Sequence, residues 1–267
     1  MEKIGLIAGN RKFPLLFAAA ARKRGNSIVA VAIKKDTSRK LNNFVDKIYW
    51  LGLDEFSRML EIFKAEGISR VVMAGQISPA RLFSREVQNC RELKDFLGGL
   101  SDKRADSIFR AVAQRLREAG IELLDSTVFM EEFFPQKGTL TKRAPSFSEL
   151  EDVYFGLNLA KAIGSLDIGQ TVAVKNKAVV AVEALEGTDN LIRRAGKITR
   201  GGFTLVKVSK PKQDMRFDVP VVGLNTVKVL RRAGGSCLAI EAGKTLFIDQ
   251  PAAVRLADRK NIAIAAV

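Results

Sequence analysis

The chain of 267 residues contains no histidine. Histidine is the usual proton donor and acceptor near neutral pH and the commonest nitrogen ligand of protein-bound metals. Its absence excludes Ser-His-Asp and Cys-His catalysis and every histidine-ligated zinc site. Acid, base or metal chemistry must therefore use Asp, Glu, Lys or Tyr, backbone amides, or an oxygen-ligated cation such as Mg²⁺.

Cysteine and aromatic side chains are also scarce. Cys90 and Cys237 are far apart and form no CxxC pattern, so we expect neither a disulfide framework nor a zinc site. One Trp, two Tyr and no RNA-recognition signature argue against a nucleic-acid partner. We find no run of 18 or more apolar residues and no signal-peptide pattern, which predicts a cytoplasmic protein.

Positive charge is abundant and spread evenly over the two halves of the chain. The net charge is +15, which attracts anionic partners such as phosphorylated small molecules or the surface of an anionic membrane. A solvated basic surface without a partner explains the same composition. The charge therefore indicates a class of partner without selecting one.

Short apolar runs alternate with amphipathic helical patterns, which predicts an α/β fold with two domains. We expect an N-terminal domain over residues 1–132 with a Rossmann-like, mostly parallel sheet. Residues 133–150, rich in Pro, Gly, Ser, Thr and charge, are the predicted linker. Residues 151–267 are predicted to form a mixed α/β catalytic domain, with a β-hairpin that turns at Asn176 and Lys177.

Two glycine-containing loops follow predicted strands of the N-terminal domain. Gly9 and Asn10 lie where the first strand leads into a helix, and Gly75 and Gln76 follow the strand "VVMA". Backbone N–H groups at such a helix start can hold a phosphate, and an amide side chain at a strand's carboxyl end faces the usual ligand crevice. A glycine that only makes the turn is the alternative.

The segment "VEALEGTDNLIRR" ends a predicted strand and begins a helix. Thr188 is suited to cap that helix, which explains the threonine alone. Glu183, Glu186 and Asp189 gather three acids near one strand end of a basic protein, and such a group favours a cation.

The segment "KPKQDMRFDVP", residues 210–220, is the second acidic motif. Read as an extended segment, its alternation places Asp214, Arg216 and Asp218 on one side. The aspartates would hold a divalent metal or activate water, while Lys210 and Arg216 would neutralise a diphosphate. Gln213 would join the same cluster. An edge strand protected by charges is the alternative interpretation.

Together the motifs resemble one family. "IGLIAGNRKFP", "VVMAGQISP", "LDIGQTVAVKNKAVVAVEALEGTDNLIRRAG" and "KPKQDMRFDVPVVGLNTV" occur in the order seen in LpxI-type UDP-2,3-diacylglucosamine pyrophosphatases of lipid A biosynthesis. The resemblance covers nearly the whole chain. This chain departs from the family before the predicted helix near Asp106, where relatives tend to have "GDD" and "KRAD" stands here. We therefore carry over no role for the start of that helix.

The resemblance implies a Mg²⁺-dependent hydrolase whose two domains hold the substrate between them. Water would attack the sugar-side phosphorus of an acylated UDP-sugar, releasing UMP and diacylglucosamine 1-phosphate. The implied catalytic acids are Asp214 and Asp218, with Asp189 and Glu183 near them, and the implied metal ligands are Asp214, Asp218 and Glu183.

The remaining predictions concern binding and location. The two glycine loops, Thr188, Lys210, Gln213 and Arg216 would bind substrate. The positive charge would let the enzyme visit the inner membrane, and a homo-oligomer stays open. A non-catalytic nucleotide or glycolipid sensor and a pyrophosphatase for another diphosphate-linked lipid precursor are the rival functions. A nucleic-acid-binding protein is a third interpretation.

Overall fold

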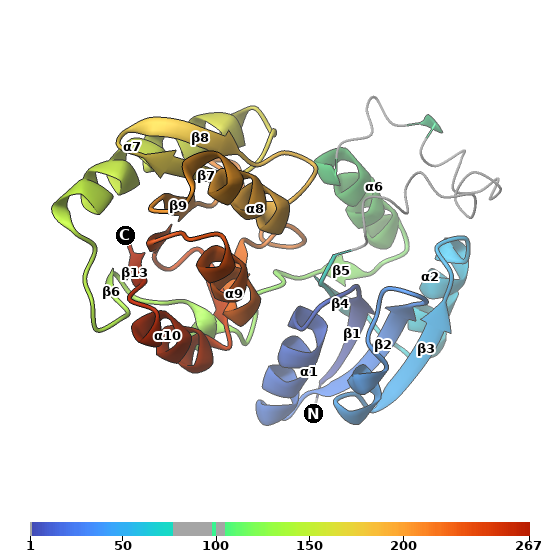
Figure 1. The fold of residues 1–267 in the computed structure, drawn as a ribbon. Helices are drawn as coiled ribbons and strands as arrows, with labels where there is room; N and C mark the ends of the chain where they lie inside the picture. Colours follow the sequence, from blue (N-terminus) through green and yellow to red (C-terminus); the bar gives the residue numbers. More distant parts are fainter. Residues whose placement is uncertain (1, 77–97, 100–104) are drawn as a thin grey trace. The chain divides into compact units, whose positions relative to one another are not determined.

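The computed structural model describes residues 2–76, 98–99 and 105–267 (Figure 1). Cys90 and the "KR" of the "KRAD" departure lie outside these residues. The chain divides into two compact units. The first unit contains the chain up to Glu131 together with Asp214–Asp218, and the second contains Glu132–Gln213 and Val219–Val267.

The first unit is built on a five-stranded sheet with the order β3-β2-β1-β4-β5, in which every pair is parallel. Its central strands are apolar on both faces, as expected for a parallel sheet that helices cover on both sides. The strands are β1 (Lys3–Ala8), β2 (Ser27–Ile33), β3 (Lys47–Leu51), β4 (Arg70–Ala74) and β5 (Glu122–Leu123).

Helices cover both faces of this sheet. The helices α2 (Phe56–Ala65) and α6 (Ala105–Glu118) share a core with Ile7, Val29 and Val31 on one face. On the other side, α1 (Phe13–Lys23) contacts β1, β2 and β4, and the short 3-10 turn η1 (Arg39–Asn43) packs against it. Pro14 stands in the first turn of α1, where its missing N–H costs no hydrogen bond.

The second unit contains a six-stranded mixed sheet with the order β6-β13-β11-β9-β7-β8. The strands β9, β11 and β13 are parallel, and β6, β7 and β8 run antiparallel to their neighbours. A separate parallel pair joins β10 to β12. The strands are β6 (Gly138–Thr139), β7 (Thr171–Lys175), β8 (Ala178–Val182), β9 (Thr204–Lys207), β10 (Val221–Gly223), β11 (Cys237–Ile240), β12 (Leu246–Ile248) and β13 (Ala263–Ala266).

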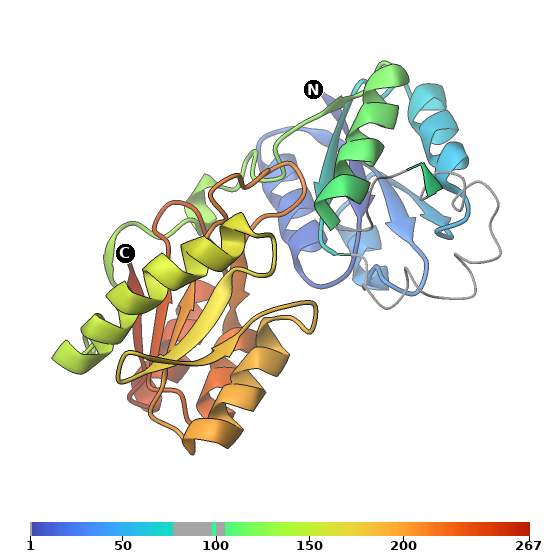
Figure 2. The same ribbon diagram turned by 90° about the horizontal axis from the view of Figure 1, so that it is seen from above.

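Helices also cover both faces of the six-stranded sheet (Figure 2). Long helix α7 (Phe147–Ser165) packs on one face, and Gly156 lets it approach closely, because a Cβ there would lie 2.7 Å from Val206. The other face is covered by α8 (Thr188–Thr199), α9 (Leu224–Arg232) and α10 (Gln250–Arg259). The 3-10 turn η2 (Glu131–Phe133) lies at the division between the two units.

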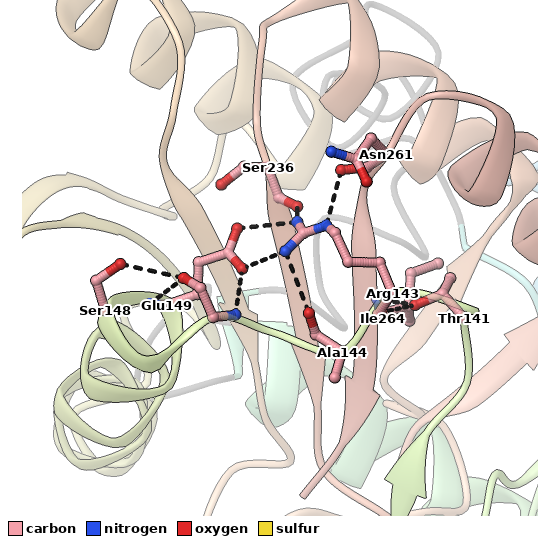
Figure 3. Close-up of polar contacts among 9 residues, drawn as sticks. Thr141, Arg143, Ala144, Ser148, Glu149, Ser236, Asn261 and Ile264 are labelled. Atoms are coloured by element: carbon pink, nitrogen blue, oxygen red, sulfur yellow. Dashed lines mark hydrogen bonds and ion pairs between the residues drawn. The ribbon is translucent and has the colours of Figure 1, made fainter.

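Residues 133–150 contribute ordered contacts to the second unit. Arg143 donates to the carboxylate of Glu149 at 2.6 and 3.0 Å and to the backbone carbonyls of Ala144, Ser236 and Asn261 (Figure 3). Glu149 in turn accepts from the backbone N–H of Ser146, which caps α7. These bonds fasten the segment to the chain just before β11 and just before β13.

The predicted fold class is confirmed: a wholly parallel N-terminal sheet and a mixed C-terminal sheet, both with helices. The predicted hairpin is also confirmed. Asn176 and Lys177 have φ of 52° and 59° between antiparallel β7 and β8, and the buried carboxylate of Asp152 accepts both of their N–H groups. Across the described helices, none is long and apolar enough to cross a membrane.

Candidate functional site

The two glycine loops meet at the carboxyl edge of the parallel sheet. β1 has β2 on one side and β4 on the other, so the chain order reverses there, which is where open α/β sheets bind ligands. The N–H of Gly9 donates to Ala74 at 2.8 Å, and the N–H of Asn10 donates to Gln76 at 2.8 Å. The Oδ1 atom of Asn10 is buried without a hydrogen-bond partner in the described structure.

The close approach of these loops requires glycine. Gly75 has φ of +84°, and a Cβ at this position would lie 2.5 Å from the carbonyl oxygen of Asn10. A Cβ on Gly9 would lie 2.6 Å from the carbonyl oxygen of Gln76. The structure therefore brings together the four residues of the two loops, with backbone and amide groups around the switch point.

Residues 214–218 form a turn, so the predicted extended segment is wrong. The backbone N–H groups of Phe217 and Asp218 both donate to the carbonyl of Asp214, at 3.3 and 3.1 Å. The alternating pattern was misleading because these residues pair with no strand among the described residues. Instead the turn itself, the Asp214 carboxylate and Ser126 satisfy their backbone groups.

The turn folds into the first unit although its sequence neighbours belong to the second. Phe217 is buried in the core beside α6 and stacks on Phe109 with ring centroids 5.0 Å apart. The buried hydroxyl of Ser126 lies 2.5 Å from the carbonyl of Met73 and also contacts the carbonyl of Arg216. The turn is thus anchored near β4 and β5.

Within the turn, Asp214 and Arg216 form a two-pronged ion pair. Oδ1 of Asp214 accepts from Nε of Arg216 at 2.9 Å, and Oδ2 accepts from Nη2 at 2.6 Å. These hydrogen bonds lower the pKa of the Asp214 carboxyl, with a further contribution from the charge of Arg110. Asp214 is therefore an ionised carboxylate held by a cation, a suitable group to act near phosphate.

A second group of polar residues lies where strands β7, β8 and β9 of the mixed sheet start or end, on one side of the sheet. Glu183 follows β8, Thr171 begins β7, and Lys207 ends β9, and the antiparallel pairings bring all three to the same edge. Thr188 begins α8 above this edge. Its hydroxyl donates to Oε1 of Glu183 at 2.6 Å and accepts from Nζ of Lys207 at 2.9 Å.

The other predicted residues of the second unit form separate contacts. Asp189, in the first turn of α8, accepts from Asn225 of α9 at 2.9 Å. Lys210 forms a half-buried ion pair with Asp167 at 2.6 Å, and its backbone N–H donates to the side chain of Gln213. Glu186 pairs with Arg194 instead of joining Glu183.

The predicted residues thus fall into two sets. Gly9, Asn10, Gly75, Gln76, Asp214, Arg216 and Asp218 belong to the first unit, and Glu183, Thr188, Asp189, Lys210 and Gln213 belong to the second. No three carboxylate or thiol side chains converge as a metal-binding group anywhere in the described ranges.

Sequence reasoning missed Lys207, Asp167 and Ser126. Lys207 could have been found from the sequence, because it is the single charge in the apolar strand "FTLVKV". A lysine is almost never buried unless it is paired. Asp167 and Ser126 had no comparable sequence signal. Their partners lie 43 and 90 residues away in the chain.

Comparisons with known proteins cover nearly the whole chain. The model of the LpxI N-terminal domain matches residues 3–133, and the model of the LpxI C-terminal domain matches residues 136–265. The chain is 31% identical over 268 residues to "UDP-2,3-diacylglucosamine pyrophosphatase LpxI" of Caulobacter vibrioides, covering 97% of this chain and 95% of the relative.

Solved structures are more distant. The biotin carboxylase domain of 2-oxoglutarate carboxylase from Hydrogenobacter thermophilus is 15% identical, with a TM-score of 0.30 over 74% of this chain and 42% of that one. N5-carboxyaminoimidazole ribonucleotide synthetase from Thermotoga maritima is 16% identical, with a TM-score of 0.24 over 70% and 43%. The chain spans less than half the length of these proteins, and scores this low support no inference.

The family predicted from the motifs is confirmed by both domain models and by the Caulobacter relative. The two domain models match in order along the chain, and they and the Caulobacter relative each cover nearly all of it. This protein belongs to the LpxI family.

Proposed function

We propose that this protein hydrolyses the diphosphate of UDP-2,3-diacylglucosamine, releasing UMP and 2,3-diacylglucosamine 1-phosphate for lipid A biosynthesis. The observation that carries the proposal is the 31% identity over 97% of the chain to a relative named as this pyrophosphatase. The absence of histidine agrees with chemistry that relies on carboxylates and cations.

The turn of residues 214–218 is the proposed catalytic segment. Asp214 is ionised and oriented by two hydrogen bonds from Arg216, so its carboxylate can accept a proton from an attacking water or hold a cation. Arg216 has five N–H groups, and those not used by Asp214 can bind phosphoryl oxygens. Asp218 lies in the same turn and would share this work.

Mg²⁺ fits the available groups only as an ion shared with the substrate. Mg²⁺ is usually bound by one or two carboxylates together with substrate phosphates and water, and the described residues provide isolated carboxylates and no cluster of three. Asp214 and Asp218 in the first unit and Glu183 in the second are each proposed as a ligand of such an ion. When bound, the ion would supply charge neutralisation on the diphosphate and activation of water.

The loops of Gly9–Asn10 and Gly75–Gln76 are proposed to bind the nucleotide or the diphosphate. They lie at the switch point of a parallel sheet, and the buried Oδ1 of Asn10 lacks a partner in the described structure. A ligand N–H or O–H at this point would satisfy that oxygen.

We also propose that the protein works in the cytoplasm and contacts the anionic inner-membrane surface transiently to collect its acylated substrate. The net charge of +15 supports the attraction. Binding to vesicles that weakens as salt rises and as the anionic lipid fraction falls is the expected behaviour.

The test is an assay of UMP release by the purified protein. Activity should require a divalent cation, and it should be greater for UDP-2,3-diacylglucosamine than for UDP-N-acetylglucosamine, which lacks the acyl chains. Release of UMP from neither compound would refute the proposal. Substrate binding without any turnover would indicate a sensor, and faster cleavage of another diphosphate-linked lipid would reassign the substrate.

A further inference from the structure

A row of buried polar side chains crosses three adjacent strands beneath the start of α8. Glu183 lies beside Thr171, and Thr171 lies beside Lys207, on the face of the sheet that α8 covers. Their exposed fractions are 7%, 0% and 6%. A charged side chain is almost never buried to this degree unless it is paired.

The two charges in this row are not paired with each other. Within the described part of the chain, Lys207 and Glu183 form no ion pair, and each contacts the hydroxyl of Thr188. That hydroxyl has a single proton, which it donates to Glu183, so Lys207 meets a hydroxyl lone pair. An ammonium has three donors, and two of those of Lys207 are left without a described acceptor.

Two unpartnered oxygens belong to the same row of side chains as this cation. The Oε2 atom of Glu183 and the Oγ1 atom of Thr171 are buried and have no hydrogen-bond partner among the described residues. Directly above, α8 begins at Thr188, and no side chain caps its first turn. The helix start therefore adds free backbone N–H groups and partial positive charge to the position that Lys207 faces.

We propose that Lys207 binds a phosphate of the diphosphate substrate, together with the first turn of α8, and that a divalent cation carried by the diphosphate meets Oε2 of Glu183. This assignment rests on the proposed function. A diphosphate with its cation supplies an anionic oxygen to the lysine and a positive centre to the carboxylate, so both buried charges gain a partner. Free phosphate supplies only the first.

Thr188 has a positioning role in this proposal. Because the hydroxyl of Thr188 donates its hydrogen bond to Glu183, its lone pairs face Lys207 and hold Nζ in place. Removing the hydroxyl while keeping the shape of the side chain should weaken ligand binding without removing the charge that binds it.

The experiment measures binding of inorganic pyrophosphate to the full-length protein by calorimetry, with and without Mg²⁺. In Lys207→Met the Kd should rise about 10- to 100-fold, the factor for one lost hydrogen bond to a charged group. Lys175→Met is the matched control, because Lys175 lies at the opposite edge of the sheet and donates to the carbonyls of Thr199 and Gly201. Its Kd should stay within about twofold, since surface charges act weakly on a distant site.

Thermal unfolding separates a binding role from a structural one. Methionine removes a buried charge that lacks a counter-ion, so the Tm of ligand-free Lys207→Met should equal or exceed that of the unmodified protein. The rise in Tm that pyrophosphate produces should be lost in this variant and retained in Lys175→Met. A lower ligand-free Tm with an unchanged Kd would show that Lys207 is structural and would overturn the proposal.

A second variant keeps the proposal testable if Lys207→Met does not fold. Thr188→Val should weaken binding of pyrophosphate with Mg²⁺, and an unchanged Kd would contradict the proposal. Glu183→Gln should reduce the gain in affinity that Mg²⁺ gives. If the unmodified protein binds pyrophosphate through Lys207 but releases no UMP from UDP-2,3-diacylglucosamine, the proposed function fails and the binding site stands. If the unmodified protein releases UMP and Lys207→Met has the same kcat/KM, the proposed function stands and the binding site at Lys207 fails.

Discussion

At the scale of single residues, the pairing of Asp214 with Arg216 determines the charge of the proposed catalytic turn. Hydrogen bonds from Arg216 lower the pKa of Asp214 from its ordinary 3.8, so the carboxylate stays ionised as the pH falls through that value. In Arg216→Gln these bonds are lost, and the pKa of Asp214 should rise. We expect kcat/KM to fall about 100-fold or more, as when one electrostatic group at a reacting centre is removed.

The pH profile of Arg216→Gln gives a readout that misfolding would not. The acid limb of kcat/KM should move to higher pH, because a weaker ion pair lets Asp214 take up a proton sooner. Arg58→Gln is a suitable control, since Arg58 forms an exposed pair with Glu55 in the same unit. An unchanged profile and rate in Arg216→Gln would exclude Asp214 as the group whose ionisation controls activity.

At the scale of elements, the turn of residues 214–218 is held by packing as well as by charge. Phe217 is 8% exposed and stacks on Phe109 of α6. Phe217→Ala should destabilise the first unit by about 3 kcal/mol, the usual cost of removing a buried phenyl ring. In hydrogen exchange, the peptides that contain β4, β5 and α6 should lose protection although the substitution lies in the C-terminal half of the sequence.

Phe247→Ala is the control for this measurement. Phe247 is 1% exposed in the core of the second unit, so its removal should expose peptides of β11 and β13 to exchange and leave β4 protected. If Phe217→Ala instead affected β11 and β13, the assignment of the turn to the first unit would be wrong.

The sequence predicted the regular elements well and the turn poorly, for a physical reason. Apolar runs such as "SIVAVAI", preceded by Gly25 and Asn26 and followed by two lysines, specify buried strands through local pattern and propensity. Asn176 favours the hairpin turn because asparagine tolerates positive φ. The alternation in "QDMRFDV" also suits a strand. Hydrogen bonds to Asp214 close the turn, and the distant partners Ser126 and Phe109 hold it in the first unit. The local alternation does not reveal those distant contacts.

At the scale of the whole molecule, the candidate site also depends on contacts that local sequence patterns do not predict. Acidic and glycine motifs located most of the polar loops, because such residues stand out from their surroundings. The chain then enters the second unit after Glu131, returns to the first at Asp214 and leaves it again after Asp218. A reading that assigns each stretch of sequence to one domain cannot anticipate this path, since it depends on contacts between residues far apart in the chain.

At the scale of the whole molecule, residues 133–150 are joined to parts of the second unit that lie about 90 to 120 residues further along the chain. Arg143 joins this segment to the N-terminal end of α7 and to the residues before β11 and β13. Arg143 and Glu149 are 26% and 12% exposed. Arg143→Met leaves the buried carboxylate of Glu149 without its cation, and we expect a loss of about 3 kcal/mol in unfolding free energy at pH 7.

The sign of the pH dependence follows from the pKa of Glu149. Burial raises this pKa, but hydrogen bonds from Arg143 and Ser146 outweigh burial, and the net pKa lies below the ordinary 4.5. The stabilisation is therefore fully present above pH 4.5 and is lost as the pH falls through the lower folded value. Without Arg143, burial dominates, so the variant should lose less stability on acidification.

Urea unfolding of both proteins at a series of pH values between 7 and 3 measures this difference. The stability gap between the unmodified protein and Arg143→Met should be constant near neutral pH. It should begin to narrow above pH 4.5, as the pH falls through the raised pKa of Glu149 in the variant, and should narrow further below pH 4.5 as the unmodified protein loses its stabilisation. Lys177→Met, which breaks the exposed pair with Glu151 on the same helix, should cost less than about 1 kcal/mol. A difference in unfolding free energy that stayed constant down to pH 3 would contradict this expectation. It would mean that Arg143 stabilises the fold through its three carbonyl contacts and that its ion pair with Glu149 contributes little.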